Sequence, residues 1–118
     1  MQKTVLIVED EFLIAMDLQS MLERRGWRVI GPVGSVAAAF RLLERERPAV
    51  ALLDVNLGNE LVTPVAEQLT SLDIPFAVAS AYDRPELVGG GVLADAPNVG
   101  KPAAEARLLL VLAKLLEN

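Results

Sequence analysis

The stretch Ala49-Val-Ala-Leu-Leu-Asp-Val-Asn-Leu-Gly58 decides the fold: an apolar run, an aspartate where it stops, and a glycine-containing turn. A short run that is apolar at every position, not at alternate ones, is typical of a strand buried on both faces of a parallel sheet covered by helices. We therefore expect Asp54 at the carboxyl end of this strand. In open α/β sheets, that edge is where binding sites form.

Other stretches predict further strands of the same kind. Thr4 to Val8 is a β-branched apolar run stopped by Glu9-Asp10-Glu11, and Pro75 to Ser80 is an apolar run stopped by a hydroxyl. The expected strands are residues 4–8, 27–33, 49–53, 75–80 and, because the alternation calls for one more, 97–100.

Helices are expected between the strands, where apolar residues recur at helical spacing. Gly89-Gly-Gly91 interrupts the segment before the last strand, and each glycine costs about 1 kcal/mol in a helix interior, so the fourth helix should be short or irregular. The other expected helices are residues 12–25, a stretch that Ser35 caps and that ends before Pro48, residues 60–71 and residues 103–116.

This repeated βα order predicts the α/β class. A strand followed by a helix five times implies a doubly wound, five-stranded parallel sheet with helices on both faces, the flavodoxin-like (βα)5 architecture. The length of 118 residues suits a single domain over residues 1–118.

Composition excludes several kinds of site. The chain has no cysteine and no histidine, so thiolate zinc sites, Ser-His-Asp chemistry and a phosphohistidine of its own are impossible, and any metal must be held by oxygen ligands. A net charge of -5 with scattered basic residues argues against a nucleic-acid partner. The longest apolar run, Leu108 to Ala113, is too short to cross a membrane, and cytoplasm is the expected location.

The residues at the strand ends should meet at one edge of the sheet. They are Glu9 and Asp10 after the first strand, Asp54 after the third, Ser80 after the fourth and Lys101 after the fifth. Carboxylates brought this close raise one another's pKa, and a divalent cation relieves the conflict. Mg²⁺ suits a few carboxylates and a backbone carbonyl, here that of Asn56, together with waters and phosphate oxygens.

This set of groups is suited to receiving a phosphoryl group. Asp54 is the candidate nucleophile, which would form an aspartyl phosphate. Mg²⁺ and Lys101 would neutralise charge on the phosphoryl oxygens, and Ser80 would donate a hydrogen bond to one of them.

At these residues the sequence resembles the receiver domain of bacterial two-component response regulators, over residues 3–117. Val8-Glu-Asp-Glu11 is similar to the acidic pair of that family, Asp54 with Asn56 and Gly58 to its phosphoacceptor loop, and Ser80-Ala81 to its switch hydroxyl and small residue. Lys101-Pro102 is similar to its lysine-proline pair, which implies a cis peptide bond there.

A finer likeness involves the segment Pro75-Phe-Ala-Val-Ala-Ser-Ala-Tyr82. It resembles the Pro-Phe-x-Phe-Ala-Thr-Gly-Tyr signature of a receiver subfamily, often single-domain, that lacks a regular fourth helix. Asn98 stands where most receivers have a Tyr or Phe switch residue, and Ala103 replaces a phenylalanine after Lys-Pro. Ser80, Ala81 and Tyr82 are therefore the candidate switch residues.

The resemblance implies a phosphorylation-dependent regulator, not an enzyme with a separate substrate. A sensor histidine kinase or phosphotransfer protein would pass its phosphoryl group to Asp54 with Mg²⁺, and a conformational switch would control a partner or output. The alternative is a non-phosphorylated protein-interaction module on the same fold. An aspartyl phosphatase is disfavoured, because such sites want an acid where Asn56 stands.

The last helix is apolar over more of its surface than one buried stripe needs. It is either deeply packed or offers a contact to an output domain or a second copy of the chain. The sequence leaves the kinase, the output, the phosphoryl lifetime and the oligomeric state open. It is also compatible with a single-domain regulator or a receiver cut from a longer chain.

Overall fold

The computed structural model describes residues 3–117. Strands and helices alternate along the chain, in this order: β1 (Thr4–Val8), α1 (Phe12–Glu23), β2 (Arg28–Val33), α2 (Val36–Arg45), β3 (Val50–Leu53), β4 (Asn56–Leu57), β5 (Glu60–Leu61), α3 (Thr63–Ser71), β6 (Phe76–Val78), α4 (Glu86–Gly89), the 3₁₀ helix η1 (Gly91–Leu93) and α5 (Glu105–Leu116).

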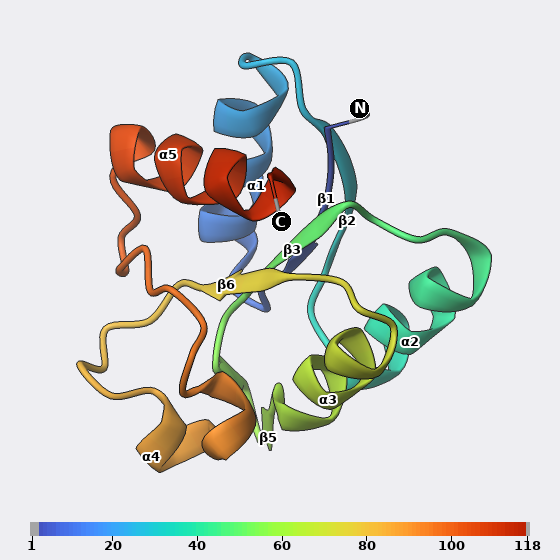
Figure 1. Ribbon diagram of the computed structural model, residues 1–118, viewed down its shortest axis with the longest axis vertical. Helices are drawn as coiled ribbons and strands as arrows, with labels where there is room; N and C mark the ends of the chain where they lie inside the picture. The colour runs from blue at the N-terminus through green and yellow to red at the C-terminus, as the bar shows by residue number, and fades with distance from the viewer. Residues whose placement is uncertain (1–2, 118) are drawn as a thin grey trace.

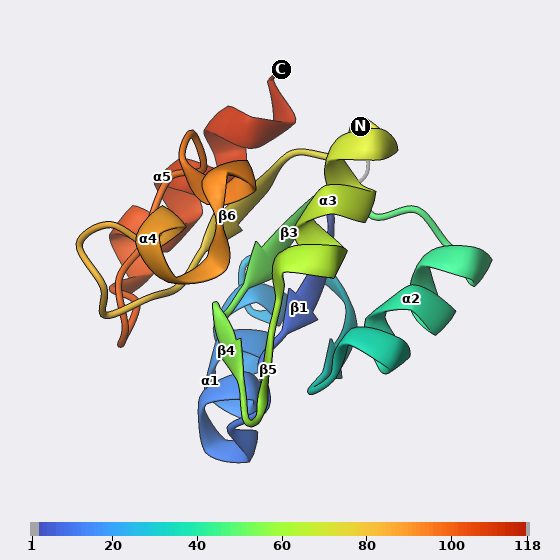
Figure 2. The same cartoon turned by 90° about the horizontal axis from the view of Figure 1, so that it is seen from below.

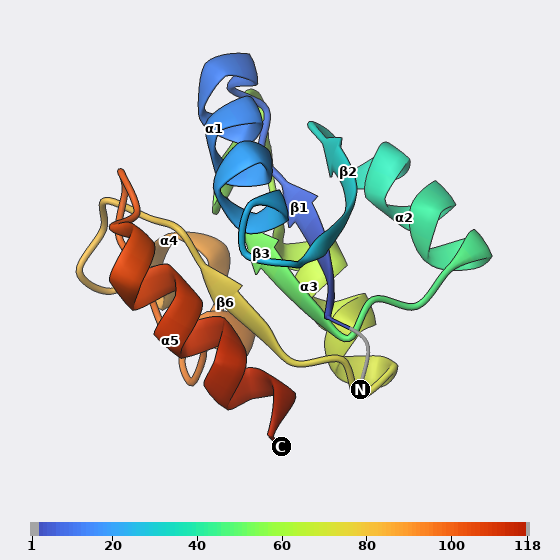
Figure 3. The ribbon, with the colours of Figure 1, turned by 90° about the horizontal axis from the view of Figure 1, so that it is seen from above.

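The main sheet has four parallel strands in the order β2-β1-β3-β6. Every residue of β1, β3 and β6 is buried, as expected for strands that are apolar at successive positions. The sheet lies between two helical layers, α1 with α5 on one face and α2 with α3 on the other (Figures 1 and 3). The doubly wound α/β class is confirmed.

Successive residues of each strand enter two separate cores, because strand side chains alternate between faces. On β1, Leu6 and Val8 pack with α2 and α3, whereas Val5 and Ile7 pack with α1 and α5. These continuous apolar runs therefore hold both helical layers on the sheet. Within residues 3–117, the buried polar side chains lie at the ends of strands, at Thr4, Glu9, Asp54 and Ser80.

The expected fifth strand is reduced to a single parallel bridge between Asn98 and Val78. The Val78 N–H donates to the Pro97 carbonyl at 2.9 Å, and the Val99 N–H donates to the Val78 carbonyl at 2.8 Å. Pro97 has no N–H to extend the ladder, and Gly100 turns away with φ of 86°. The segment still lies beside β6, so Lys101 follows it at the same edge of the sheet.

The third helix begins later than predicted. A short antiparallel hairpin, β4 with β5, occupies residues 56–61 and turns at Gly58 with φ of 71° (Figure 2). The helix therefore starts at Thr63 and not at Glu60, with Pro64 in its first turn, where a missing N–H costs least. This hairpin places Asn56 and Gly58 next to the end of β3.

The fourth helix is short, as the three glycines predicted: α4 has four residues and is followed by η1 with three. The Lys101-Pro102 peptide bond is cis, as the family resemblance implied, and Gly31-Pro32 is cis as well. Ser35 caps α2, since its side chain accepts the Ala38 N–H at 3.1 Å.

Candidate functional site

Three strands end in buried polar residues at one edge of the sheet. Glu9 follows β1, Asp54 follows β3 and Ser80 follows β6, and each is about 5% exposed. Backbone hydrogen bonds place the two acids, because the Glu9 N–H donates to the Val33 carbonyl at 2.8 Å and the Asp54 N–H donates to that of Val8 at 2.9 Å. The acids thus sit side by side where the central strands stop.

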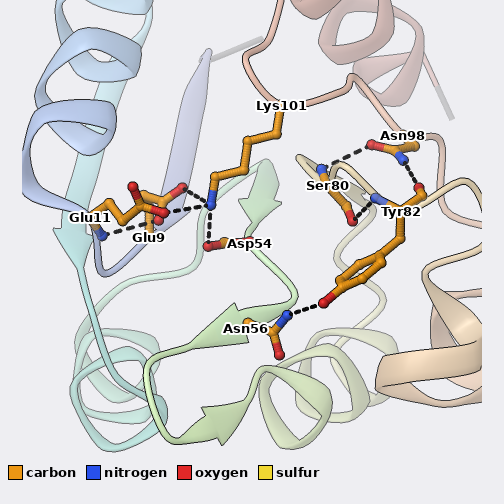
Figure 4. A network of polar contacts seen from close by, with 8 residues as sticks. All are labelled: Glu9, Glu11, Asp54, Asn56, Ser80, Tyr82, Asn98 and Lys101. Carbon is orange, nitrogen blue, oxygen red and sulfur yellow. Dashed lines mark hydrogen bonds and ion pairs between the residues drawn. The ribbon is translucent and has the colours of Figure 1, made fainter.

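Lys101 points into this group of acids (Figure 4). Its Nζ donates to Asp54 Oδ2 at 2.9 Å and to Glu11 Oε1 at 3.1 Å, and it lies 3.6 Å from Glu9 Oε1. The acids and the lysine come from segments far apart in the chain. The fold therefore assembles one ammonium group and three carboxylates at the carboxyl edge.

The buried position of Glu9 disfavours its ionised form. Burial is the main reason that its pKa is raised from 4.5 to about 7; a hydrogen bond from the Glu11 N–H opposes the rise, and neighbouring Asp54 adds to it. Its Oε1 atom is buried and has no hydrogen-bond partner among the residues that the structure describes. Such an orphaned oxygen is what a proton or a cation would satisfy.

The Lys101 side chain stays protonated and positively charged. Partial burial works to lower its pKa, but the hydrogen bonds and charges of Asp54, Glu11 and Glu9 outweigh burial and raise the pKa above its ordinary value. A permanent positive charge therefore stands beside the Asp54 carboxylate.

The other predicted metal ligands border the same pocket. Asp10 is exposed and lines it together with Asp54, Asn56 and Gly58. Glu9 lies behind it, outside the lining, whereas Glu11 belongs to it. Among residues 3–117, the carboxylate oxygens that lie within 4.8 Å of one another are those of Glu9, Glu11 and Asp54, so Asp10 is not part of that tight group.

The donor set fits a hard divalent cation. All candidate ligands are oxygens, as Mg²⁺ prefers, and the cluster carries more negative charge than Lys101 neutralises. Glu9 Oε1, which has no hydrogen-bond partner within residues 3–117, points to the same need for positive charge. The residues present are therefore compatible with the magnesium site that the sequence predicted.

The candidate switch residues line the same pocket, and two of them, Ser80 and Tyr82, belong to a network of hydrogen bonds (Figure 4). The Tyr82 N–H donates to Ser80 Oγ at 3.0 Å, and Asn56 Nδ2 donates to the Tyr82 hydroxyl at 2.9 Å. Asn98 bonds the backbone at both Ser80 and Tyr82. Ala81 is exposed and lines the pocket.

Sequence reasoning gave no role to two residues of this site. Glu11 contacts Lys101, and its signal was its place as the third acid of a run that begins at Glu9. Asn98 was noted only as the replacement of an aromatic residue. Nothing in the sequence shows that its side chain bonds the loop of Ser80, because those residues are 18 positions apart.

A larger cavity of about 590 Å³ lies elsewhere, around the start of β6, with Ile74, Phe76, Val92 and Leu115 among its lining residues. It contains none of the clustered acids, so its size does not make it the chemical site. No helix within residues 3–117 is long and apolar enough to cross a membrane.

Comparison with known proteins identifies the family. Residues 5–113 match the family model described as the response regulator receiver domain. The chain belongs to this family. The resemblance deduced from the acidic pair, Asp54, Ser80 and Lys101 is thereby confirmed, and receiver domains are signalling modules of two-component systems.

Similar receiver-containing proteins are longer than this chain. It is 34% identical over 87 residues to the transcriptional regulatory protein PdtaR of Mycobacterium tuberculosis, covering 73% of this chain and 42% of that protein. It is 33% identical over 114 residues to the sensory transduction protein LytT of Bacillus cereus, covering 93% and 46%. The receiver chain thus spans about half the length of the curated relatives it matches.

Solved structures confirm the receiver fold. The receiver domain of a sensor histidine kinase from Pseudomonas aeruginosa, solved with a magnesium ion in its active site cleft, superposes with a TM-score of 0.85. Identity is 20%, and the match covers all of both chains. At this identity, the likeness concerns the fold alone.

Proposed function

We propose that this receiver accepts a phosphoryl group on Asp54 from a phosphohistidine of a sensor histidine kinase or phosphotransfer protein. The observation that carries the proposal is the 2.9 Å contact between Lys101 Nζ and Asp54 Oδ2 at the base of an open pocket lined by Ser80. It joins a carboxylate to a permanent positive charge where a phosphoryl group can enter. The donor histidine lies outside residues 1–118, because these contain none.

In the proposed transfer, an Asp54 carboxylate oxygen forms a bond to phosphorus while the bond between phosphorus and the histidine nitrogen breaks. The bonding electron pair goes to the histidine nitrogen, and the imidazole leaves as a neutral ring when its second nitrogen already carries a proton; otherwise the imidazolate takes one proton from water. Lys101 stabilises the negative charge on the phosphoryl oxygens, and the Ser80 hydroxyl donates a hydrogen bond to one of them. Positioning and charge supply most of the rate in such reactions.

Mg²⁺ is part of the proposal. Glu9, Asp10, Asp54 and the Asn56 backbone carbonyl would hold it. When bound, the ion would supply further charge neutralisation for the phosphoryl oxygens. The P. aeruginosa receiver with magnesium in its cleft supports this by family analogy.

Phosphorylation is proposed to shift the receiver between two conformations through Ser80, Ala81 and Tyr82. The readout is a partner, an output domain or a second copy, with α5 as the contact. On α5, Leu108, Val111 and Leu112 are buried in the core, whereas Leu110 is 54% exposed and is therefore accessible to such a contact. The receiver domain would cover residues 1–118 and act in the cytoplasm.

Mass spectrometry after incubation with a small acyl phosphate, with and without Mg²⁺, tests the proposal. The wild-type protein should gain the mass of one phosphoryl group in the presence of Mg²⁺, and Asp54→Asn should gain none. Asp73→Asn is the matched control, because Asp73 is exposed and its φ of 59° suits asparagine equally well. Labelling of Asp54→Asn would refute the acceptor assignment, and an unlabelled wild-type protein would favour the non-phosphorylated interaction module.

A further inference from the structure

Asn98 makes an unusual set of contacts for a half-buried side chain. Its Oδ1 atom accepts the Ser80 N–H at 3.1 Å and the Gly100 N–H at 2.9 Å. Its Nδ2 atom donates to the Tyr82 carbonyl at 3.0 Å. One carboxamide therefore joins the loop after β6 to the segment that carries Lys101 (Figure 4).

The chemistry of these contacts requires a carboxamide. Two backbone N–H groups need an acceptor and one backbone carbonyl needs a donor, and asparagine offers both on a short side chain. Arg107 on α5 holds the backbone of Asn98. Its Nε and Nη2 atoms donate hydrogen bonds to the Asn98 carbonyl at 3.2 and 3.1 Å. Both the side chain and the backbone carbonyl of Asn98 are therefore held by hydrogen bonds.

These contacts of Asn98 determine how the Ser80 hydroxyl is placed. Ser80 Oγ accepts the Tyr82 N–H at 3.0 Å, so its own hydrogen remains free to be donated. Ser80 and Tyr82 keep this arrangement because Asn98 bonds the N–H of the first and the carbonyl of the second. Tyr82 also reaches Asn56, in the hairpin that follows Asp54.

We propose that Asn98 is a positioning residue for the phosphorylation of Asp54, and this inference rests on the proposed function. It holds the Ser80 hydroxyl and the Lys101 segment in place before a phosphoryl group arrives, so that their charge and hydrogen bond need little rearrangement during transfer. Among residues 3–117, the Asn98 side chain hydrogen-bonds to Ser80, Tyr82 and Gly100 and to no acidic side chain, so it acts on Asp54 through these residues.

The first test is the phosphorylation rate with a small acyl phosphate at saturating Mg²⁺. Asn98→Ala should lower the rate about tenfold, less than the 10²- to 10³-fold typical of losing a donor outright, because Ser80 and Lys101 remain. Asn98→Asp keeps an acceptor for the Ser80 and Gly100 N–H groups but loses the donor to the Tyr82 carbonyl, so its rate should lie between those of wild type and Asn98→Ala. Gln68→Ala, which shortens an exposed carboxamide on α3, is the control and should leave the rate unchanged.

A second measurement separates positioning from general loosening of the site. The Mg²⁺ concentration that gives half-maximal rate should be the same for wild type and Asn98→Ala, because Asn98 contacts no carboxylate. The inference is overturned by a wild-type rate in Asn98→Ala, by equal losses in the alanine and aspartate variants, or by a Mg²⁺ requirement that moves with the rate.

Amide hydrogen exchange tests the contacts without any phosphorylation. The Ser80 and Gly100 amides should exchange at least tenfold faster in Asn98→Ala, whereas the amides of β1 should not change. Unchanged exchange at Ser80 and Gly100 would refute the contacts themselves. A wild-type protein that takes no phosphoryl group would refute the proposed function and the positioning role together, while the exchange rates would still decide whether Asn98 holds this loop.

Discussion

Replacing Glu9 by glutamine should stabilise the metal-free protein at alkaline pH. The Glu9 side chain is 2% exposed, and its Oε1 atom lies 3.6 Å from Lys101 Nζ and accepts no hydrogen bond from residues 3–117. Burial, the largest cause, raises its pKa from 4.5 to about 7, with a further contribution from Asp54. The folded protein therefore prefers the protonated side chain.

The sign and the size of the effect follow from this pKa. Because the folded pKa lies above the unfolded one, the stabilisation is complete below about pH 4.5 and is lost as pH rises through about 7. A rise from 4.5 to about 7, at about 1.36 kcal/mol per pKa unit, corresponds to a loss of about 3 kcal/mol. Glutamine does not ionise, so the variant should be spared this loss.

Urea unfolding in the presence of a chelator measures the difference. At pH 8, Glu9→Gln should be more stable than wild type by about 3 kcal/mol, and at pH 4.5 the two should agree within about 1 kcal/mol. Glu67→Gln removes an exposed carboxylate from α3 and gives the background of losing one negative charge. A difference that is equal at both pH values, or a variant less stable than wild type at pH 8, would refute the reasoning.

Three further substitutions test the site and the scaffold. Lys101→Gln removes the cation 2.9 Å from Asp54 Oδ2, and the phosphorylation rate measured by mass spectrometry should fall about 10²-fold; an unaltered rate would show that this charge is dispensable. Ser35→Ala removes the cap that accepts the Ala38 N–H at 3.1 Å and should cost about 1 kcal/mol in urea unfolding, so an unchanged midpoint would count against the cap. Leu112→Ala opens a cavity at a fully buried position and should cost about 2 to 5 kcal/mol, measured in the same way, whereas a loss under 1 kcal/mol would mean that α5 is loosely packed.

Much of the scaffold could be predicted because its signals are local. Continuous apolar runs at β1 and β3 specify strands buried on both faces, and the serine before α2 specifies where that helix begins. Glycines 89 to 91 likewise limit the fourth helix to a short turn. Each of these features depends on residues within a few positions of one another.

The predictions of the fifth strand and of the start of the third helix were wrong, because contacts between distant residues and backbone geometry determine the structure there. The residues before Lys101 form one bridge and not a strand, because Pro97 lacks an N–H and Gly100 turns the chain. The third helix starts late because the hairpin around Gly58 competes for residues 56–61. Helical spacing of apolar residues does not show where such a hairpin ends.

The sequence by itself determined the parallel α/β architecture, the order of the acidic, hydroxyl and lysine residues along the strand ends, and the family. Only the tertiary structure decided that Glu11 joins Lys101, that Asp10 stands outside the tight acidic group, and that Asn98 bonds the loop of Ser80. The physical reason is the separation in sequence between the residues that interact. Strand and helix signals arise from neighbouring residues, whereas hydrogen bonds between side chains tens of positions apart depend on directions that exist only once the layers have packed.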